Sequence, residues 1–222
     1  MTTRRSAEPP LLLAPVRWLA VACFTGALLL VVPALLTVAD ESETPLLWYA
    51  GRATGFVSYV ALWASLFTGA LVSARGVEGL LSRRWLIEFH QQWTVAGLIA
   101  VVAHVAVFVA HSFSDITLVG ALVPYTSDVM RVQIALGTVA FWGLALVAIS
   151  SWLRAYIPYA WWRSIHALSF GMCILAFAHA LQAGSDALAW PARALYLVTA
   201  ALTVGAVVAR LLVAAGRRER RA

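Results

Sequence analysis

Five histidines are the residues of this chain best suited to chemistry, and all of them fall in or beside strongly apolar segments. His90, His104 and His111 form one group, and His166 and His179 form a second. A polar, ionisable side chain is expensive to place in an apolar medium, so a histidine there is by default a functional candidate. A neutral imidazole also binds transition metals through one ring nitrogen. The histidines therefore direct attention to metal binding in an apolar setting.

That setting is an integral membrane protein. Of the 222 residues, 62% are hydrophobic and 12% are charged, and the mean hydropathy is +0.85, whereas about half of a soluble domain is apolar. Hydropathy predicts six spans, each long enough for a hydrocarbon core about 30 Å thick. They cover residues 17–38, 47–73, 86–111, 132–152, 164–183 and 191–213. The expected fold class is all-α, a polytopic six-helix transmembrane bundle that forms a single domain over residues 1–222.

The charged residues predict how this bundle is oriented. All 16 basic residues are arginine, and most fall at the two termini and in every second loop, whereas acidic residues favour the alternate loops. By the positive-inside rule we expect a multi-pass protein of the cell membrane with both termini in the cytoplasm. The net charge of +6 is then an orientation signal. Nucleic acid is not an expected partner, because no soluble basic domain is present to bind it.

The same topology places four histidines at two depths. The third and fifth spans are separated by one returning helix, so they run in the same direction. His90 and His166 follow arginine-rich loops closely and are expected near the inner face, whereas His104 and His179 are expected toward the outer face. Fourteen residues at about 1.5 Å rise separate the two levels by about 20 Å. The sequence therefore predicts two histidine pairs at matched depths.

Two opposed imidazoles at one depth, present twice, favour haem. Haem iron takes one axial ligand on each side of an apolar ring, and that ring is stable between helices. Zinc or copper needs a third or fourth ligand, and the nearest acid, Glu88, lies at the inner rim. We therefore expect two b-type haems, with the four paired histidines as metal ligands. The alternative is a set of polar residues that only make interhelical hydrogen bonds.

Helical periodicity agrees with one half of this arrangement. The fourteen steps from His90 to His104 are nearly four turns, so both rings share a face of the third span. The thirteen steps from His166 to His179 are about 3.6 turns, which places those rings on different faces of an ideal helix. A distortion near Gly171, or a sideways approach of one imidazole, would reconcile the two.

At the level of motifs, the chain resembles a known family. HQQWTVAGLIAVVAH on the third span and WRSIHALSFGMCILAFAH on the fifth have thirteen and twelve residues between their histidines. They resemble the ferric reductase-like transmembrane domain of ferric reductases, NADPH oxidases and the haem-containing membrane subunit of bacterial methionine sulfoxide reductase systems. WYAGRATGFVSYVALWASLFTGAL on the second span is similar to that family's helix too, and the likeness covers about residues 47–183. The resemblance implies an electron-transfer oxidoreductase, with His90 and His166 holding an inner haem and His104 and His179 an outer one.

The resemblance also implies residues beyond the ligands. Arg52 matches an arginine that lines the acceptor site of NADPH oxidases, and His111 is an approximate match for a histidine there. Arg52 and His111 are therefore the catalytic candidates. Haem propionates are carboxylates that pair with cations at the membrane interface. The candidate partners are Arg52, Arg131 and Arg193 on the outer side and Arg84, Arg154 and Arg163 on the inner side.

The electron donor is expected to be a separate molecule. Full-length ferric reductases and NADPH oxidases carry flavin and nicotinamide domains, whereas this sequence contains no phosphate-cradling glycine loop. A cytoplasmic flavoprotein reductase and membrane quinol are the candidate donors, and ferric iron, oxygen, a quinone or a periplasmic protein the candidate acceptors on the outer side. One alternative is a non-enzymatic haem-binding anchor or redox-sensor subunit of a larger complex. Another is a metal or haem transporter, which needs acids or broken helices at mid-depth that the spans do not show.

Overall fold

The structure is a computed structural model that describes residues 46–74, 82–111 and 114–219, with only the backbone described at residues 73–74 and from residue 209 onward. Within these ranges the chain is helical, with six α-helices and one short 3-10 helix, η2. The elements are α2 (Leu46–Ala74), α3 (Arg83–Ala110), α4 (Leu118–Leu122), α5 (Arg131–Trp152), η2 (Arg154–Tyr156), α6 (Tyr159–Ala183) and α7 (Trp190–Glu219).

Five of these helices, α2, α3, α5, α6 and α7, are long and apolar enough to cross a membrane. They correspond to the second to sixth spans expected from hydropathy, so the all-helical, multi-span architecture is confirmed for the described residues. The first expected span, 17–38, lies outside them. The first residues of the helices and of the expected spans differ most at α6. This helix begins at Tyr159, directly after its N-cap, Pro158, whereas the expected span begins at residue 164.

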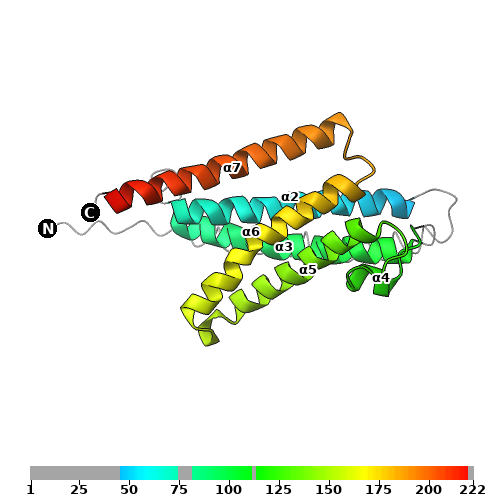
Figure 1. The fold of residues 1–222 in the computed structure, drawn as a ribbon, viewed down its shortest axis with the longest axis horizontal. Helices are drawn as coiled ribbons and strands as arrows, with labels where there is room; N and C mark the ends of the chain where they lie inside the picture. Colours follow the sequence, from blue (N-terminus) through cyan, green and yellow to red (C-terminus); the bar gives the residue numbers. More distant parts are fainter. Residues whose placement is uncertain (1–45, 75–81, 112–113, 220–222) are drawn as a thin grey trace, which may run out of the picture.

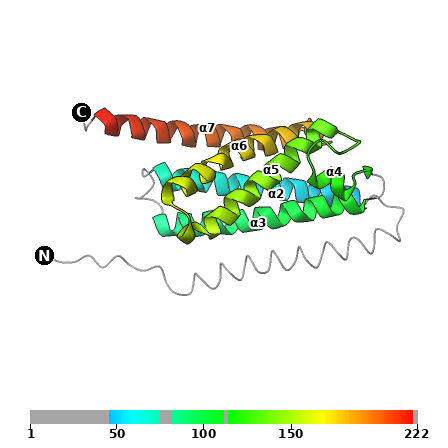
Figure 2. The same ribbon diagram turned by 60° about the horizontal axis from the view of Figure 1, so that its bottom comes forward.

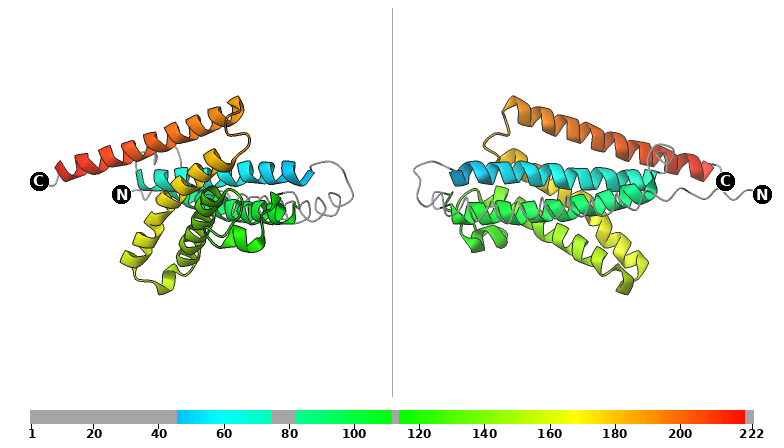
Figure 3. Two further views of the ribbon diagram at one scale, coloured as in Figure 1. Left: turned by 45° about the vertical axis from the view of Figure 1, so that its right-hand side comes forward. Right: turned by 180° about the vertical axis from the view of Figure 1, so that it is seen from behind.

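The helices form two antiparallel hairpins that cross each other. α2 packs along α3, α5 packs along α6, and α7 runs beside α2. Figure 1 shows the α5/α6 hairpin running obliquely across the α2/α3 hairpin, and Figures 2 and 3 show the same relation from other sides. α3 and α6 begin at one end of the bundle, which carries Arg83, Arg84, Arg154 and Arg163 and is called the arginine-rich end below. α3 and α6 therefore run in the same direction, one in each hairpin.

Small side chains hold the α2/α3 hairpin together. Ala61 on α2 and Ala100 on α3 are completely buried, and a Cβ atom added to Gly97 would lie 2.8 Å from Leu62 Cδ2. Close approach of small residues is the usual way in which helices associate in a membrane, where burial of apolar surface gives no advantage over lipid. By contrast, α6 buries none of its residues. Within the described residues, the α2/α3 hairpin therefore buries more of its side chains than the α5/α6 hairpin does.

Aromatic residues attach α7 to the rest of the bundle. Ala187, Ala192 and Tyr196 form a buried cluster that also receives Phe56, Tyr59, Phe177 and Ala180. The hydroxyls of Tyr59 and Thr199 share a 2.6 Å hydrogen bond, and Trp63 Nε1 donates to the Thr199 carbonyl oxygen at 3.1 Å. This contact links the two ends of the described sequence and leaves the facing sides of the hairpins to the histidines.

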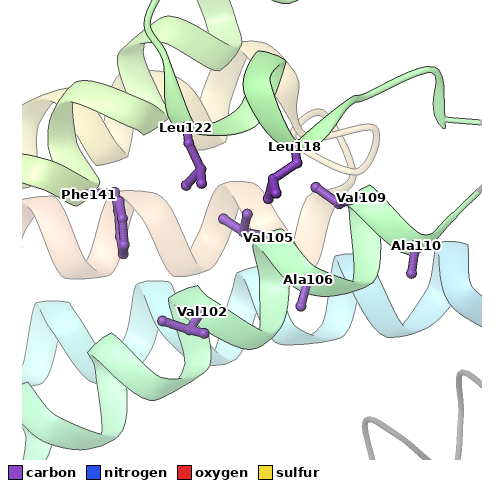
Figure 4. Close-up of a pocket in the computed structure, with 8 residues that line it drawn as sticks. All are labelled: Val102, Val105, Ala106, Val109, Ala110, Leu118, Leu122 and Phe141. Atoms are coloured by element: carbon purple, nitrogen blue, oxygen red, sulfur yellow. The ribbon is translucent and has the colours of Figure 1, made fainter.

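A groove on the other side of the bundle is entirely aliphatic or aromatic. It has a volume of about 410 Å³ and lies between α3, α4 and α5 (Figure 4). Its lining residues are Val102, Val105, Ala106, Val109, Ala110, Leu118, Leu122 and Phe141. Among the described residues, its lining offers no polar side chain.

Candidate functional site

The four paired histidines come together between the two hairpins. The ring centroids of His90 on α3 and His166 on α6 lie 6.0 Å apart, and those of His104 and His179 lie 6.3 Å apart. We call His90 and His166 the first pair, at the arginine-rich end, and His104 and His179 the second pair. Both associations are those that the matched depths predict. The ring planes within each pair are nearly perpendicular, at 75° and 85°.

The thirteen-residue spacing on α6 is accommodated by the course of the helix. α6 is an uninterrupted α-helix through Gly171, so it contains no break of the kind that the spacing suggested. It runs obliquely across α2 and α3 (Figure 1), so the direction from α6 toward α3 changes along its length. Rings that leave α6 on different faces can therefore both meet partners on α3. The expectation of a distortion at Gly171 rested on treating the two helices as parallel.

Backbone carbonyls fix the tautomer of three of the four imidazoles. His90 Nδ1 donates to the Ser65 carbonyl oxygen, His104 Nδ1 to that of Gly51, and His179 Nδ1 to that of Gln133, each at 2.8 Å. A carbonyl oxygen only accepts hydrogen bonds, so Nδ1 must carry the proton in each ring. The lone pair then resides on Nε2, which is the arrangement that a metal-bound histidine requires.

A serine hydroxyl fixes the fourth imidazole. Ser151 Oγ donates its hydrogen to the Val147 carbonyl oxygen at 2.7 Å and accepts from Trp162 Nε1 at 3.3 Å. His166 Nδ1 lies 3.3 Å from the same hydroxyl. Because the hydroxyl hydrogen is already used, Ser151 can only accept from His166, so this ring also carries its proton on Nδ1. In the neutral form of all four histidines, Nε2 is therefore the nitrogen that carries the lone pair.

Glycines make room for three of the rings. A Cβ atom added to Gly55 would lie 3.0 Å from the His104 ring, one added to Gly69 would lie 3.1 Å from His90, and one added to Gly137 would lie 2.9 Å from His179. Real Cβ atoms rarely approach other atoms so closely. Each ring thus occupies a cradle on the neighbouring helix of its own hairpin that a side chain would fill.

The donor set suits a group that needs two axial imidazoles. With metal–nitrogen bonds of about 2.0 Å, two imidazoles on opposite sides of one metal ion have ring centroids about 6.2 Å apart. The two observed separations, 6.0 Å and 6.3 Å, bracket this value. Within the described ranges, no group of three or more His, Cys, Asp or Glu side chains is arranged to hold a metal ion. The residues therefore fit haem, whose ring supplies the remaining four ligands, better than a metal ion bound by protein alone.

The candidate arginines have varied surroundings. Arg52 on α2 forms an ion pair with Asp186 in the turn before α7, and Nε donates to Oδ2 at 2.6 Å. Arg84 pairs with Glu88 one turn further along α3. Arg131 Nε donates to the Ser127 carbonyl oxygen at 3.3 Å. Arg163 and Arg193 are exposed.

His111 lies apart from the pairs. It caps the C-terminal end of α3, and its ring centroid is 6.2 Å from that of Trp48. Its backbone N–H donates to the Val107 carbonyl oxygen at 3.0 Å. The second pair and Arg52 lie at the same end of the bundle, so the two catalytic candidates remain on one side of the molecule.

Several residues of the site were not identified from the sequence. They are Gly51, Gly55, Ser65, Gly69, Gln133, Gly137 and Ser151. One signal was available, because Gly51 and Gly55 form a GxxxG motif, GRATG, which marks close helix packing. Ser151 and Gln133 gave no such signal, since their roles depend on which helix lies next to α6.

No family model, curated protein or solved structure matches the chain. The interpretation of function therefore rests on the geometry of the two pairs and on the motifs of the third and fifth spans.

Proposed function

We propose that this chain is a transmembrane electron-transfer protein that carries two b-type haems, one at each histidine pair. The observation that carries the proposal is the presence of two facing imidazole pairs, each with a centroid separation near 6.2 Å and each with Nδ1 already engaged. When bound, a haem with two axial imidazoles supplies reversible one-electron chemistry and has no open position for oxygen.

The protein's own groups orient the ligands before any cofactor is held. On α3, His90 and His104 are bound to carbonyl oxygens of α2, and on α6, His179 is bound to a carbonyl oxygen of α5. These bonds fix the rotation of each ring and raise the basicity of Nε2. The glycine cradles set how close each ring lies to its neighbouring helix. The four rings lie between long apolar helices and are each partly buried, a setting that favours a porphyrin over a hydrated ion.

The direction of transfer follows from the charges. The positive-inside rule places the arginine-rich end and both termini in the cytoplasm of a cell whose membrane the chain crosses. Electrons would then enter near the first pair from a cytoplasmic flavoprotein reductase or from quinol, and leave near the second pair. A membrane voltage that is negative inside favours this direction by about 2.3 kcal/mol per electron per 100 mV. Arg52 and His111, at the outer end, are the candidates for contact with the acceptor, and Arg52, Arg84, Arg131, Arg163 and Arg193 for contact with propionates.

Haem content of the purified full chain tests the proposal. After expression with ample haem precursor, we expect two haems per chain and a low-spin, six-coordinate spectrum. His90→Ala and His104→Ala should each remove one haem, and His111→Ala, the matched control outside the pairs, should retain both. A colourless wild-type protein, or equal haem loss from all three variants, would overturn the assignment.

Reduction by added donors separates the oxidoreductase from its alternative. In detergent or in vesicles, quinol or reduced flavin should reduce both haems within the time course of turnover. Haems that are present but are not reduced by either donor would favour a non-enzymatic anchor or redox-sensor subunit. This outcome would leave the ligand assignment intact and would overturn only the catalytic part of the proposal.

A further inference from the structure

We propose that the two histidine pairs differ in reduction potential, and that Ser151 and Trp162 make the first pair the site of higher potential. The inference rests on the proposed function, since it concerns the haems proposed for these pairs. Ser151 and Trp162 would act as positioning residues, through the ligand His166. The second pair, in contrast, has no hydroxyl or indole on the Nδ1 side of either ring within the described residues.

The first observation is the unequal strength of the hydrogen bonds to Nδ1. Both rings of the second pair donate to backbone carbonyl oxygens at 2.8 Å. In the first pair His90 Nδ1 has the Ser65 carbonyl oxygen at 2.8 Å and the Ser65 hydroxyl at 3.1 Å, but His166 has only the Ser151 hydroxyl at 3.3 Å. A strong acceptor on Nδ1 makes the imidazole a better electron donor to a bound metal and stabilises its oxidised state. The long bond of His166 therefore favours the reduced state at the first pair.

The second observation is that Ser151 is shared. Its oxygen accepts from Trp162 Nε1 and from His166 Nδ1, both at 3.3 Å. The Trp162 ring also stacks on the His166 ring, with centroids 5.0 Å apart and planes at 24°. The indole thus competes with the imidazole for one acceptor while holding it in place. This competition lengthens the bond on which the basicity of His166 depends.

The third observation is the charge around each pair. The Arg154 guanidinium lies over the Trp162 ring at 4.9 Å and has no ion pair among the residues that the structure describes. The sequence contains no acidic residue between Asp128 and Asp186, so no acid lies in the α5/α6 turn, whereas on α3 Glu88 pairs with Arg84 at the same end. At the other end, Asp186 neutralises Arg52. Positive charge favours the form of a metal centre that has gained an electron, so the charges and the hydrogen bonds act in the same direction.

A higher reduction potential at the first pair makes electron transfer to the second pair depend on the membrane voltage and on the acceptor. An electron that enters at the arginine-rich end rests at the first pair, and its transfer to the second pair runs against the potential difference. A membrane voltage that is negative at the arginine-rich end, or rapid consumption by the acceptor, offsets that difference. The arrangement therefore retains electrons on the donor side until one of these conditions is met.

Spectroelectrochemistry of the purified full chain measures the two potentials. The electrode supplies one electron to each haem through mediators, and no bond is made or broken. We expect two reduction steps. His104→Ala should retain the step of higher potential, and His90→Ala should retain the step of lower potential. A single step for two haems, or survival of the lower step in His104→Ala, would overturn the inference while leaving the two-haem proposal standing.

Variants of Ser151 and Trp162 test the cause, and their effects should have opposite signs. Ser151→Ala removes the acceptor and should raise the reduction potential of the first pair. Ser151→Thr keeps the hydroxyl and should leave that potential at the wild-type value. Trp162→Phe keeps the stacked ring but removes the competing donor, so it should lower the same step. Ser150→Ala is the matched control, because Ser150 also donates to the Val147 carbonyl oxygen, at 3.0 Å, and contacts no histidine.

Each outcome of these variants decides a part of the inference. Opposite shifts confined to the first step support it. Shifts of the same sign in Ser151→Ala and Trp162→Phe, or an equal shift in Ser150→Ala, would overturn the role of the shared hydroxyl. If Ser151→Ala does not accumulate, Ser151→Thr and Trp162→Phe still give the comparison. A purified wild-type protein that contains no haem would instead contradict the proposed function.

Discussion

The two hairpins contribute equally to the histidine pairs but differ in how they are held together. The α2/α3 hairpin has a buried seam of small residues along its length, including Ala61, Ala70, Ala96 and Ala100. In the α5/α6 hairpin, α5 buries residues such as Ala135 and Ala140, whereas α6 buries none. One hairpin is therefore stabilised mainly by its own packing. The other contains a helix, α6, that packs mainly against its hairpin partner α5, to a lesser extent against α2, and buries no residue.

This difference suggests a division of labour. Each hairpin orients its own imidazoles, because the acceptor of every Nδ1 lies on the hairpin partner of the helix that carries the ring. The α2/α3 hairpin can therefore present His90 and His104 as a preformed surface. The α5/α6 hairpin presents His166 and His179 with a less constrained helix, and closing it onto α2 and α3 completes the pairs. If the pairs hold haem as proposed, its binding should then order α6 more than α3.

The largest effect is expected when the cofactor is withheld. In chain produced without haem synthesis, amide hydrogen exchange in α6 should rise about tenfold or more, equivalent to ~1.4 kcal/mol of local opening free energy. Exchange in the middle of α2 and α3 should change little, because their seam does not involve a ligand. Mass spectrometry of peptides from the two forms measures this. An equal rise in α3 and α6 would show that the hairpins do not differ.

A larger side chain in the interface between α2 and α3 should have the next largest effect, a loss of thermal stability. Gly97→Leu adds a side chain where even a Cβ atom would lie 2.8 Å from Leu62 Cδ2 and 3.2 Å from its backbone nitrogen. Forcing such a group into a packed interface costs about 1–3 kcal/mol. Because α2 supplies the acceptors for both His90 and His104, both haems should be weakened together.

The control for this change is Gly205→Ala on α7, where nothing lies within 4 Å of an added Cβ atom. Thermal denaturation in detergent, followed by haem absorbance and by circular dichroism, measures the two variants. Gly205→Ala should denature like the wild type. A Gly97→Leu protein of unchanged stability would contradict the description of α2 and α3 as a tightly packed pair.

Filling a single cradle should affect one haem and compare the hairpins directly. Gly55→Val on α2 and Gly137→Val on α5 both displace a ring of the second pair, His104 or His179. Each variant should lose the haem of that pair and keep the other, as measured by haem content per chain. Only Gly137→Val should also raise hydrogen exchange in α6. Retention of both haems in either variant would mean that the cradle is not needed.

The sequence predicted the larger features of this arrangement because they depend on composition and on spacing along one chain. Hydropathy located the five described spans, and matched depth placed His90 opposite His166. The acceptors of the Nδ1 hydrogen bonds could not be predicted from the sequence. Every residue has a carbonyl oxygen, so nothing in the side chains of Ser65 or Gln133 distinguishes them. The angle between the helices could not be predicted either, which is why the spacing on α6 left two explanations open, a distortion near Gly171 and a sideways approach of one imidazole.

The smallest expected effect concerns Arg52, whose partner Asp186 is 134 residues away in the sequence. This ion pair ties the start of α2 to the turn that follows α6, so it is a link between the hairpins themselves. Both side chains are about 30% exposed, so the pair should contribute no more than about 1 kcal/mol. Asp186→Asn keeps an oxygen that can accept from Arg52 Nε and removes only the charge. We expect a small fall in thermal stability that disappears at high salt, since salt screens the interaction in the wild type as well.

Glu88→Gln is the matched control, because Glu88 pairs with Arg84 within α3 and that pair links no two hairpins. It should lower stability less than Asp186→Asn, and haem content should be unchanged in both variants. If Asp186→Asn instead lost the haem of the second pair, the ion pair would be holding the hairpins in register for that site. The α5/α6 hairpin would then owe its position to a surface contact as well as to the cofactor, and the contrast between a preformed and a dependent hairpin would be weaker than the packing suggests.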